Sequence, residues 1–349
     1  MNSQTLISKG SSKKTSGDRG DLASRIFRLR EFGIFGILIL FVGATTVARP
    51  RFLGGQNIRF ILIDTTVFAL LALGETMVVV SRNVDLSVGS VLGLSAFVSS
   101  NLYQQFHHVA LVEVFLVGLG IGLVCGALNG LLVTVGKVPS LVVTLATLYI
   151  IRGVDVLIVG GGQVVANSLP NSFIEVTSSQ LLGVPTVSIV VAVLIGLGAY
   201  YMKNFRSGRD LYAIGSNPDA ARLVGIATSR RVFNAFLLSG AIAGVTGVIW
   251  ASYYGTIDST AGTGYELQVV AAVVVGGVAI FGGSGSVIGA AIGALLLNTI
   301  NSALYVLGVS AFWDQAIAGF LLLLAISLDR GIFVYLQRTI RRKKVLGGS

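Results

Sequence analysis

Four polar side chains lie within stretches that are otherwise apolar, and their chemistry could serve a ligand. Asn129, Thr144, Asn298 and Asn301 can each donate to and accept from the hydroxyl groups of a polyhydroxy solute. Polar groups inside a membrane-spanning segment are costly, so these residues are candidates for a substrate pathway. Hydrogen bonding between neighbouring helices explains the same residues equally well. The sequence leaves both interpretations open.

Residues that would form a catalytic or metal-binding set are missing along the sequence. The two histidines, His107 and His108, are adjacent, and the single cysteine, Cys125, lies in a glycine-rich apolar stretch. The pair Gly136-Lys137 lacks the spacing and the Ser or Thr of a phosphate-binding loop. We therefore expect a chain that is not an enzyme, has no catalytic residues, carries no metal or cofactor of its own and does not itself bind ATP.

Arg152 and Asp155 stand three residues apart in another apolar stretch, a spacing at which two side chains can pair on one helix face. No two carboxylates lie clearly in the middle of the apolar stretches. A carrier driven by protons or sodium ions needs a coupling-ion site near the middle of the membrane. This distribution disfavours an ion-coupled secondary sugar transporter, which stays the alternative function.

Glycines recur every four residues in two apolar stretches. The spacing places them on one helix face, where the backbone of a neighbouring helix can approach closely. The pattern therefore predicts tight helix packing. The first set is Gly118, Gly122, Gly126 and Gly130, and the second set is Gly285, Gly289 and Gly293.

A polar segment between two apolar stretches predicts a short, isolated helix. Ser216 or Asn217 suits the N-cap, Pro218 suits the first helical position, and Asp219 suits the positive end of the helix dipole. Gly225 is expected to end the helix. Such a helix can close the end of a helical bundle, or it can act as a lever that a partner protein pushes.

The elements that position these residues must be membrane helices. Of the 349 residues 54% are hydrophobic and only 11% charged, whereas soluble proteins carry about 25% charged residues. A spanning helix needs about 20 mostly apolar residues. We therefore predict an all-α polytopic membrane protein with about ten transmembrane helices. They cover 31–48, 58–80, 86–103, 112–134, 139–159, 184–202, 231–253, 266–281, 285–307 and 312–329.

The net charge of +10 comes from basic residues that lie mostly outside these apolar stretches. Most Lys and Arg residues fall in the first 30 residues, in the loop 203–231 and in the last 20 residues, as expected for cytoplasmic segments. Both termini are therefore expected inside. Basic and aromatic residues do not alternate as on nucleic-acid-binding faces, so we expect no nucleic-acid partner.

The same reading divides the chain into three parts. Residues 1–30 form a flexible basic cytoplasmic tail, residues 31–330 form the transmembrane domain with an outside loop at 160–184, and residues 331–349 form a second basic tail. The stretch 129–136 also resembles 301–308 weakly, in the opposite orientation, as an inverted repeat requires. A second match, between 88–93 and 284–289 in parallel orientation, competes with the first. We therefore predict an internal repeat and leave the alignment of its two halves open.

Four segments carry a resemblance to a known family. They are Arg82–Ser90, Ala213–Ile226, Gly262–Leu267 and Gly276–Gly285. With these landmarks, residues 31–330 resemble the permease subunits of bacterial ABC importers for carbohydrates, the group for ribose, xylose, arabinose, rhamnose and autoinducer-2.

The resemblance implies properties that the residues alone do not. The chain would be the multi-pass permease subunit of an ATP-driven importer in the bacterial inner membrane. It would move a monosaccharide or similar polyhydroxy solute from a periplasmic solute-binding protein to the cytoplasm. A cytoplasmic ABC ATPase subunit would hold ATP and Mg²⁺, and a second permease chain, identical or different, would complete the part embedded in lipid. The coupling helix that contacts the ATPase would comprise Gly215, Ser216, Asn217, Pro218, Asp219, Ala220, Ala221, Arg222 and Gly225.

Overall fold

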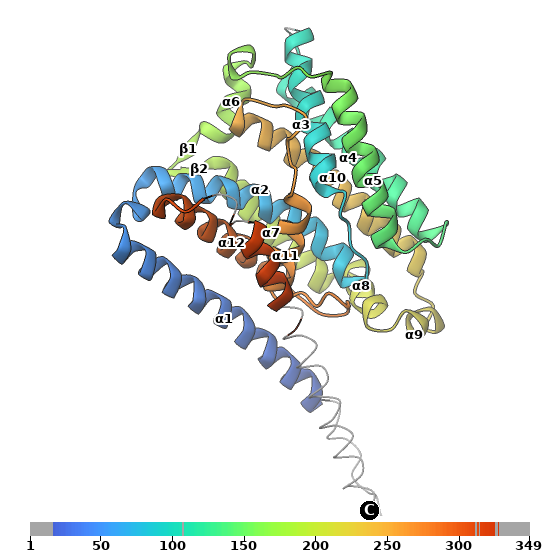
Figure 1. Ribbon diagram of the computed structural model, residues 1–349. Helices are drawn as coiled ribbons and strands as arrows, with labels where there is room; N and C mark the ends of the chain where they lie inside the picture. Colours follow the sequence, from blue (N-terminus) through green and yellow to red (C-terminus); the bar gives the residue numbers. More distant parts are fainter. Residues whose placement is uncertain (1–16, 107, 311–312, 314, 325–326, 328–349) are drawn as a thin grey trace, which may run out of the picture.

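The computed structural model is a bundle of helices (Figure 1). It describes residues 17–106, 108–310, 313, 315–324 and 327, with side chains from residue 33 onward. The long helices are α1 (Gly17–Ala48), α2 (Gly55–Val80), α3 (Val88–Gln105), α4 (Leu111–Thr134), α5 (Ser140–Val159), α7 (Thr186–Asn204), α10 (Thr228–Tyr254) and α12 (Val287–Leu307). The short elements are η1 (Pro50–Leu53), η2 (Ala166–Ser168), α6 (Asn171–Ser178), β1 (Gln180–Leu181), β2 (Val184–Pro185), α8 (Arg206–Ser216), α9 (Pro218–Leu223) and α11 (Tyr265–Val275).

Six helices are long and apolar enough to cross a membrane, namely α2, α4, α5, α7, α10 and α12. Each coincides within a few residues with a predicted span. Shorter apolar helices cover Gly33–Ala48, α11 and Gln315–Leu324. The prediction of an almost entirely helical membrane protein is therefore confirmed.

The two predicted tails lie at the ends of the described chain. The tail 331–349 and residues 1–16 lie outside the described residues. The helix α1 begins at Gly17, within the first predicted tail, and the flexibility of that tail stays a prediction. Leu, Arg, Ala and Glu, which favour helix, are frequent between residues 21 and 32, so the helix extends beyond the apolar stretch.

The eighth predicted span, 266–281, was wrong as one continuous helix. The helix α11 has 11 residues and is therefore about 16 Å long, roughly half the thickness of a hydrocarbon core. The helix ends at Val275, and Gly277 just beyond it has φ +100°, which a helix does not accept. The segment 255–264 before α11 is not helical either, with positive φ at Gly255, Gly262 and Gly264. The segment 255–264 lies close against α3, where the backbone at Ala261 leaves no space for a side chain at Gly93.

The helices α4 and α10 meet along a seam of glycines. A Cβ atom on Gly122 of α4 would overlap the carbonyl group of Gly240 of α10, and the reverse also holds. Gly118, Gly126 and Gly130 face α10 in the same way. The four-residue spacing thus marks a close approach of two helix backbones.

The second predicted glycine set divides between a helix and a loop. Gly293 of α12 contacts the backbone of Ala272 and Gly276 at the end of α11, so this part of the set does pack helices. Gly285 was wrongly assigned to the helix, because it precedes α12 and has φ +142°. Ser286 accepts a hydrogen bond from the Gly289 backbone N–H at 3.2 Å and caps the helix after Gly285.

The two long predicted loops lie at opposite ends of the bundle. Figure 1 shows α6, β1 and β2 at one end and α8 and α9 at the other. The first group belongs to the predicted outside loop 160–184 and its border with α7, and the second group belongs to the predicted inside loop 203–231. Both loops contain regular elements, short helices in each and a two-stranded hairpin in the first.

Candidate functional site

A cavity of about 200 Å³ opens between α2, α11 and α12 beside the end of α10. The residues that line it are Phe60, Asp64, Phe68, Tyr254, Tyr265, Gln268, Asn298, Asn301 and Tyr305. The lining positions on α2 are four residues apart, and those on α12 are three and four apart, so each helix turns one face toward the cavity. The cavity brings together Asn298 and Asn301, two of the four polar residues that the sequence singled out.

Aromatic side chains fix the wall of this cavity. The Phe68 and Tyr265 rings lie 4.6 Å apart between centroids, and Trp250 Nε1 donates to the Tyr265 hydroxyl at 3.0 Å. The Tyr254 hydroxyl donates to Asp64 Oδ1 at 3.2 Å. Asp64 is the one charged residue among those that line the cavity in the described part of the chain. Apolar ring faces beside amide and carboxylate groups suit a small, neutral solute with many hydroxyl groups.

Most of this wall could not be predicted from the sequence. Asp64 lies at the edge of a predicted span, and the tyrosines are common interfacial residues, so neither position predicts a ligand. The signal present in the sequence was the spacing of Asn298, Asn301 and Tyr305, which places three polar groups on one face of an apolar helix.

Asn129 and Thr144 lie away from the cavity. Asn129 Nδ2 donates to Ser87 Oγ at 2.8 Å, and Thr144 Oγ1 donates to the Val84 carbonyl at 3.2 Å. Both side chains are buried. They hold residues 81–87, the connection between α2 and α3, and this arrangement matches the helix-to-helix interpretation of these polar groups.

Two buried carboxylates meet at the same connection, an arrangement that the sequence analysis did not predict. Glu75 Oε1 in the last turns of α2 accepts from the Asp85 backbone N–H at 3.1 Å. Asp85 in turn accepts from Ser87 Oγ at 2.6 Å and from Ser239 Oγ at 3.3 Å. Glu75 lies in a predicted span and Asp85 lies between two predicted spans, and the tight turn after α2 brings them together.

Arg152 of α5 holds the irregular segment 255–264. Its Nη1 donates to the Ala261 carbonyl at 2.6 Å and to the Ser259 carbonyl at 3.2 Å. The same nitrogen lies 3.6 Å from Asp155 Oδ2, so the predicted Arg152–Asp155 pair is confirmed. Carbonyl groups outside a helix need other donors within a membrane. Arg152 therefore stabilises the irregular segment 255–264 that precedes α11.

The predicted short helix is α9, and it starts as the sequence indicates. Asn217 Oδ1 accepts from the backbone N–H groups of Asp219 at 3.1 Å and Ala220 at 3.0 Å, and Pro218 is the first helical residue. Gly225 has φ +81° and follows the end of the helix, as predicted. Leu223 is 89% exposed, so α9 presents an apolar side chain at the end of the bundle.

The segment 215–225 divides into a buried and an exposed part. Gly215 belongs to α8, and the backbones of Val80 and Gly283 leave no space for a side chain there. The Tyr212 hydroxyl of α8 donates to the Gly285 carbonyl at 3.1 Å. Burial raises the pKa of the Tyr212 hydroxyl. The helix α8 is therefore fixed to the bundle, and α9 is its accessible neighbour.

Comparison with known proteins identifies the class. Residues 57–326 match the family model described as branched-chain amino acid transport system / permease component. The chain is 34% identical over 319 residues to the autoinducer 2 import system permease protein LsrC of Enterobacter sp. (strain 638), covering 91% of this chain and 92% of that protein. It is 36% identical over 307 residues to LsrC of Salmonella typhi, covering 88% of this chain and 86% of that protein. No solved structure matches the chain.

The chain belongs to this family of transport-system permease components. It is the multi-pass, inner-membrane permease subunit of an ABC importer and not an enzyme. Permeases of this family work with an ATPase and a solute-binding protein, so the cavity and the exposed α9 belong to a transport subunit.

Proposed function

We propose that this permease moves a small, neutral polyhydroxy solute, a monosaccharide or a compound such as autoinducer-2. The observation that carries the proposal is the cavity with one carboxylate, two asparagines and a wall of aromatic rings. Relatives named as autoinducer 2 import permeases support the same class of solute. The cavity lacks a basic lining residue in the described part of the chain, which disfavours anionic solutes.

We infer ten membrane crossings with both termini inside. The six long apolar helices, the shorter apolar helices and the basic loops at one end support this topology. The segment 255–264 and α11 together form one broken crossing, as transporters use near a substrate site. The internal repeat stays a prediction.

The cavity is completed by a second permease chain, identical or different. Tyr305 at its rim is 83% exposed, and Asn301 and Asp64 are only half-buried. Polar groups at this depth need protein or water beside them, because lipid offers no hydrogen-bonding partner. A substrate path between two permeases meets that requirement.

The helix α9 is the contact through which a cytoplasmic ATPase drives transport. Its exposed side chains, Asp219 and Leu223, lie at the end of the bundle that carries the basic loops. ATP and Mg²⁺ bind to the ATPase and not to this chain. The periplasmic solute-binding protein contacts the opposite end, where α6 and the hairpin lie.

The test is uptake of labelled monosaccharides and of autoinducer-2 by proteoliposomes that contain the complete transporter. Leu223→Glu and Asp219→Lys are expected to reduce uptake at least tenfold while the protein stays folded in the membrane. Leu223→Met is the matched control and is expected to keep uptake. Gly215→Arg is unsuitable, because its buried position would make any loss of uptake a folding effect. Full uptake with Leu223→Glu would contradict the coupling role of α9.

A further inference from the structure

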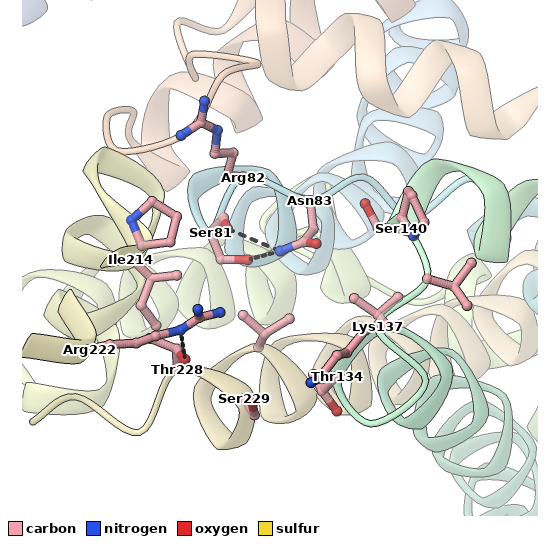
Figure 2. A pocket seen from close by; sticks show the side chains of 15 residues that line it. Ser81, Arg82, Asn83, Thr134, Lys137, Ser140, Ile214, Arg222, Thr228 and Ser229 are labelled. Carbon is pink, nitrogen blue, oxygen red and sulfur yellow. Dashed lines mark hydrogen bonds between the residues drawn. The ribbon is translucent and has the colours of Figure 1, made fainter. Parts of the chain in front are cut away.

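A second and larger cavity lies at the end of the bundle that carries α9. It measures about 500 Å³ and is enclosed by the turn after α2, the α4–α5 connection, α9 and the first turn of α10 (Figure 2). The residues that frame it include Ser81, Asn83, Thr134, Lys137, Arg222 and Ser229. It shares no lining residue with the substrate cavity.

The charge of this cavity is of one sign. Lys137 and Arg222 line it, the side chain of the lining residue Arg82 points away from them in Figure 2, and none of the described lining residues is acidic. Figure 2 shows Arg222 and Lys137 on opposite walls, with hydroxyl groups between them. Arg222 Nε donates to Thr228 Oγ1 at 3.4 Å, and its Nη1 lies 3.7 Å from Asp219, a highly exposed pair that is worth little. The cavity is therefore suited to an anion.

The backbone supports the same assignment. Lys137 has φ +54° and Arg82 has φ +69°, two of the three non-glycine residues with positive φ in the described chain. Side chains other than glycine rarely adopt this region, and such conformations concentrate at functional sites. Both strained residues are basic, and both line this cavity.

An apolar surface continues from the cavity along the α4–α5 connection. Val135 is 74% exposed, Leu141 is 55% exposed and Val142 is 57% exposed. Exposed apolar side chains beside a membrane helix face acyl chains. A molecule with a phosphate head and acyl tails would place its head in the basic cavity and its tails along this surface.

We propose that the cavity binds the phosphate group of an anionic phospholipid of the cytoplasmic leaflet. Basic pockets between membrane helices on the cytoplasmic side are known to suit such head groups. The bound phosphate bridges Lys137 on the α4–α5 connection and Arg222 on α9. It thereby stabilises the position of α9, the helix proposed to contact the ATPase, against the rest of the bundle. Transport should then depend on the charge of the surrounding lipid. Free phosphate has the same chemistry, and the test distinguishes the two sources.

The test measures lipid retained by the purified full chain in native mass spectrometry, with cardiolipin, phosphatidylglycerol or phosphatidylcholine added. The double variant Lys137→Gln/Arg222→Gln is expected to retain roughly tenfold less anionic lipid than the native protein. The matched control, Lys203→Gln/Arg206→Gln, removes two exposed basic residues outside the cavity and is expected to retain the native amount. Lys137→Arg keeps the positive charge and is expected to retain anionic lipid as the native protein does.

Four outcomes decide the proposal. The proposal is overturned if both double variants lose the same amount of anionic lipid, or if neither loses any. It is also overturned if the native protein retains as much phosphatidylcholine as anionic lipid. Cavity-dependent binding of inorganic phosphate that displaces the lipid at millimolar concentration would assign the site to free phosphate. Melting temperatures of both double variants are measured in parallel, and if the cavity variant melts early, the single variant Lys137→Gln replaces it.

Discussion

Arg152 Nη1 donates to the Ala261 carbonyl oxygen at 2.6 Å, and this bond joins the middle of α5 to the irregular segment before α11. Asp155, fully buried on the same helix, lies 3.6 Å from that guanidinium. A charged pair at this depth is costly. Its retention is explained by the two carbonyl groups that Arg152 satisfies beside the start of α11.

Removing the guanidinium should destabilise the protein strongly. Arg152→Met leaves Asp155 buried without a partner and is expected to cost about 3–5 kcal/mol of folding stability. Thermal unfolding in detergent measures the effect. The double variant Arg152→Met/Asp155→Leu is expected to recover part of the loss, because no uncompensated charge remains. A native melting temperature for Arg152→Met would contradict the role assigned to this bond.

The glycine seam between α4 and α10 offers a matched pair of substitutions on one helix. Gly122→Ala forces a methyl group into the α10 backbone and is expected to destabilise by about 1–3 kcal/mol. Gly120→Ala, where a Cβ atom meets nothing within 4 Å, is expected to be neutral. Melting temperatures of the two variants decide the question, and equal values would show that the backbones do not pack this closely.

The N-cap of α9 can be tested without touching the apolar contact surface. Asn217→Ala removes the acceptor for two backbone N–H groups and is expected to cost about 1 kcal/mol locally. Hydrogen exchange at the amides of α9 should then be about fivefold faster. Asn217→Ser keeps a capping oxygen and is expected to exchange nearly as the native protein does. Unchanged exchange in Asn217→Ala would show that the cap does not hold α9.

Asp64 is expected to contribute directly to the substrate cavity. Asp64→Leu removes the acceptor of the Tyr254 hydroxyl and the one carboxylate at the cavity wall, and we expect uptake to fall roughly tenfold. Thr65→Val, a change at the neighbouring residue that does not line the cavity, is expected to keep uptake. Both variants are compared by their initial uptake rates in proteoliposomes. Equal rates would show that Asp64 does not contribute to the substrate site.

Much of the fold followed from local sequence patterns. Apolar length located the long helices, four-residue glycine spacing located the α4–α10 seam, and the Asn217-Pro218 pair located the start of α9. These features depend on residues close in sequence, which explains why they could be predicted.

The remaining features depend on contacts between distant residues. Arg152 and Ala261 are 109 positions apart, and the cavity combines residues of four helices. The predicted span 266–281 continued past Val275 because the sequence there is apolar, and the positive φ of Gly277 shows where the helix stops. Glu75 and Asp85 are close in sequence, but the turn between them is set by packing against Ser239 of α10.

The central claim, that substrate passes through the cavity between α2, α11 and α12, is tested most directly by cysteine protection. The single native cysteine is buried, so Asn301→Cys in a Cys125→Ala background gives one reactive thiol. In the complete transporter, we predict that sugar delivered by the binding protein slows maleimide labelling of this thiol. The same sugar should leave labelling of Asn204→Cys, exposed at the end of α7 away from the cavity, unchanged. Labelling of Asn301→Cys at the same rate with and without transported sugar would contradict the account.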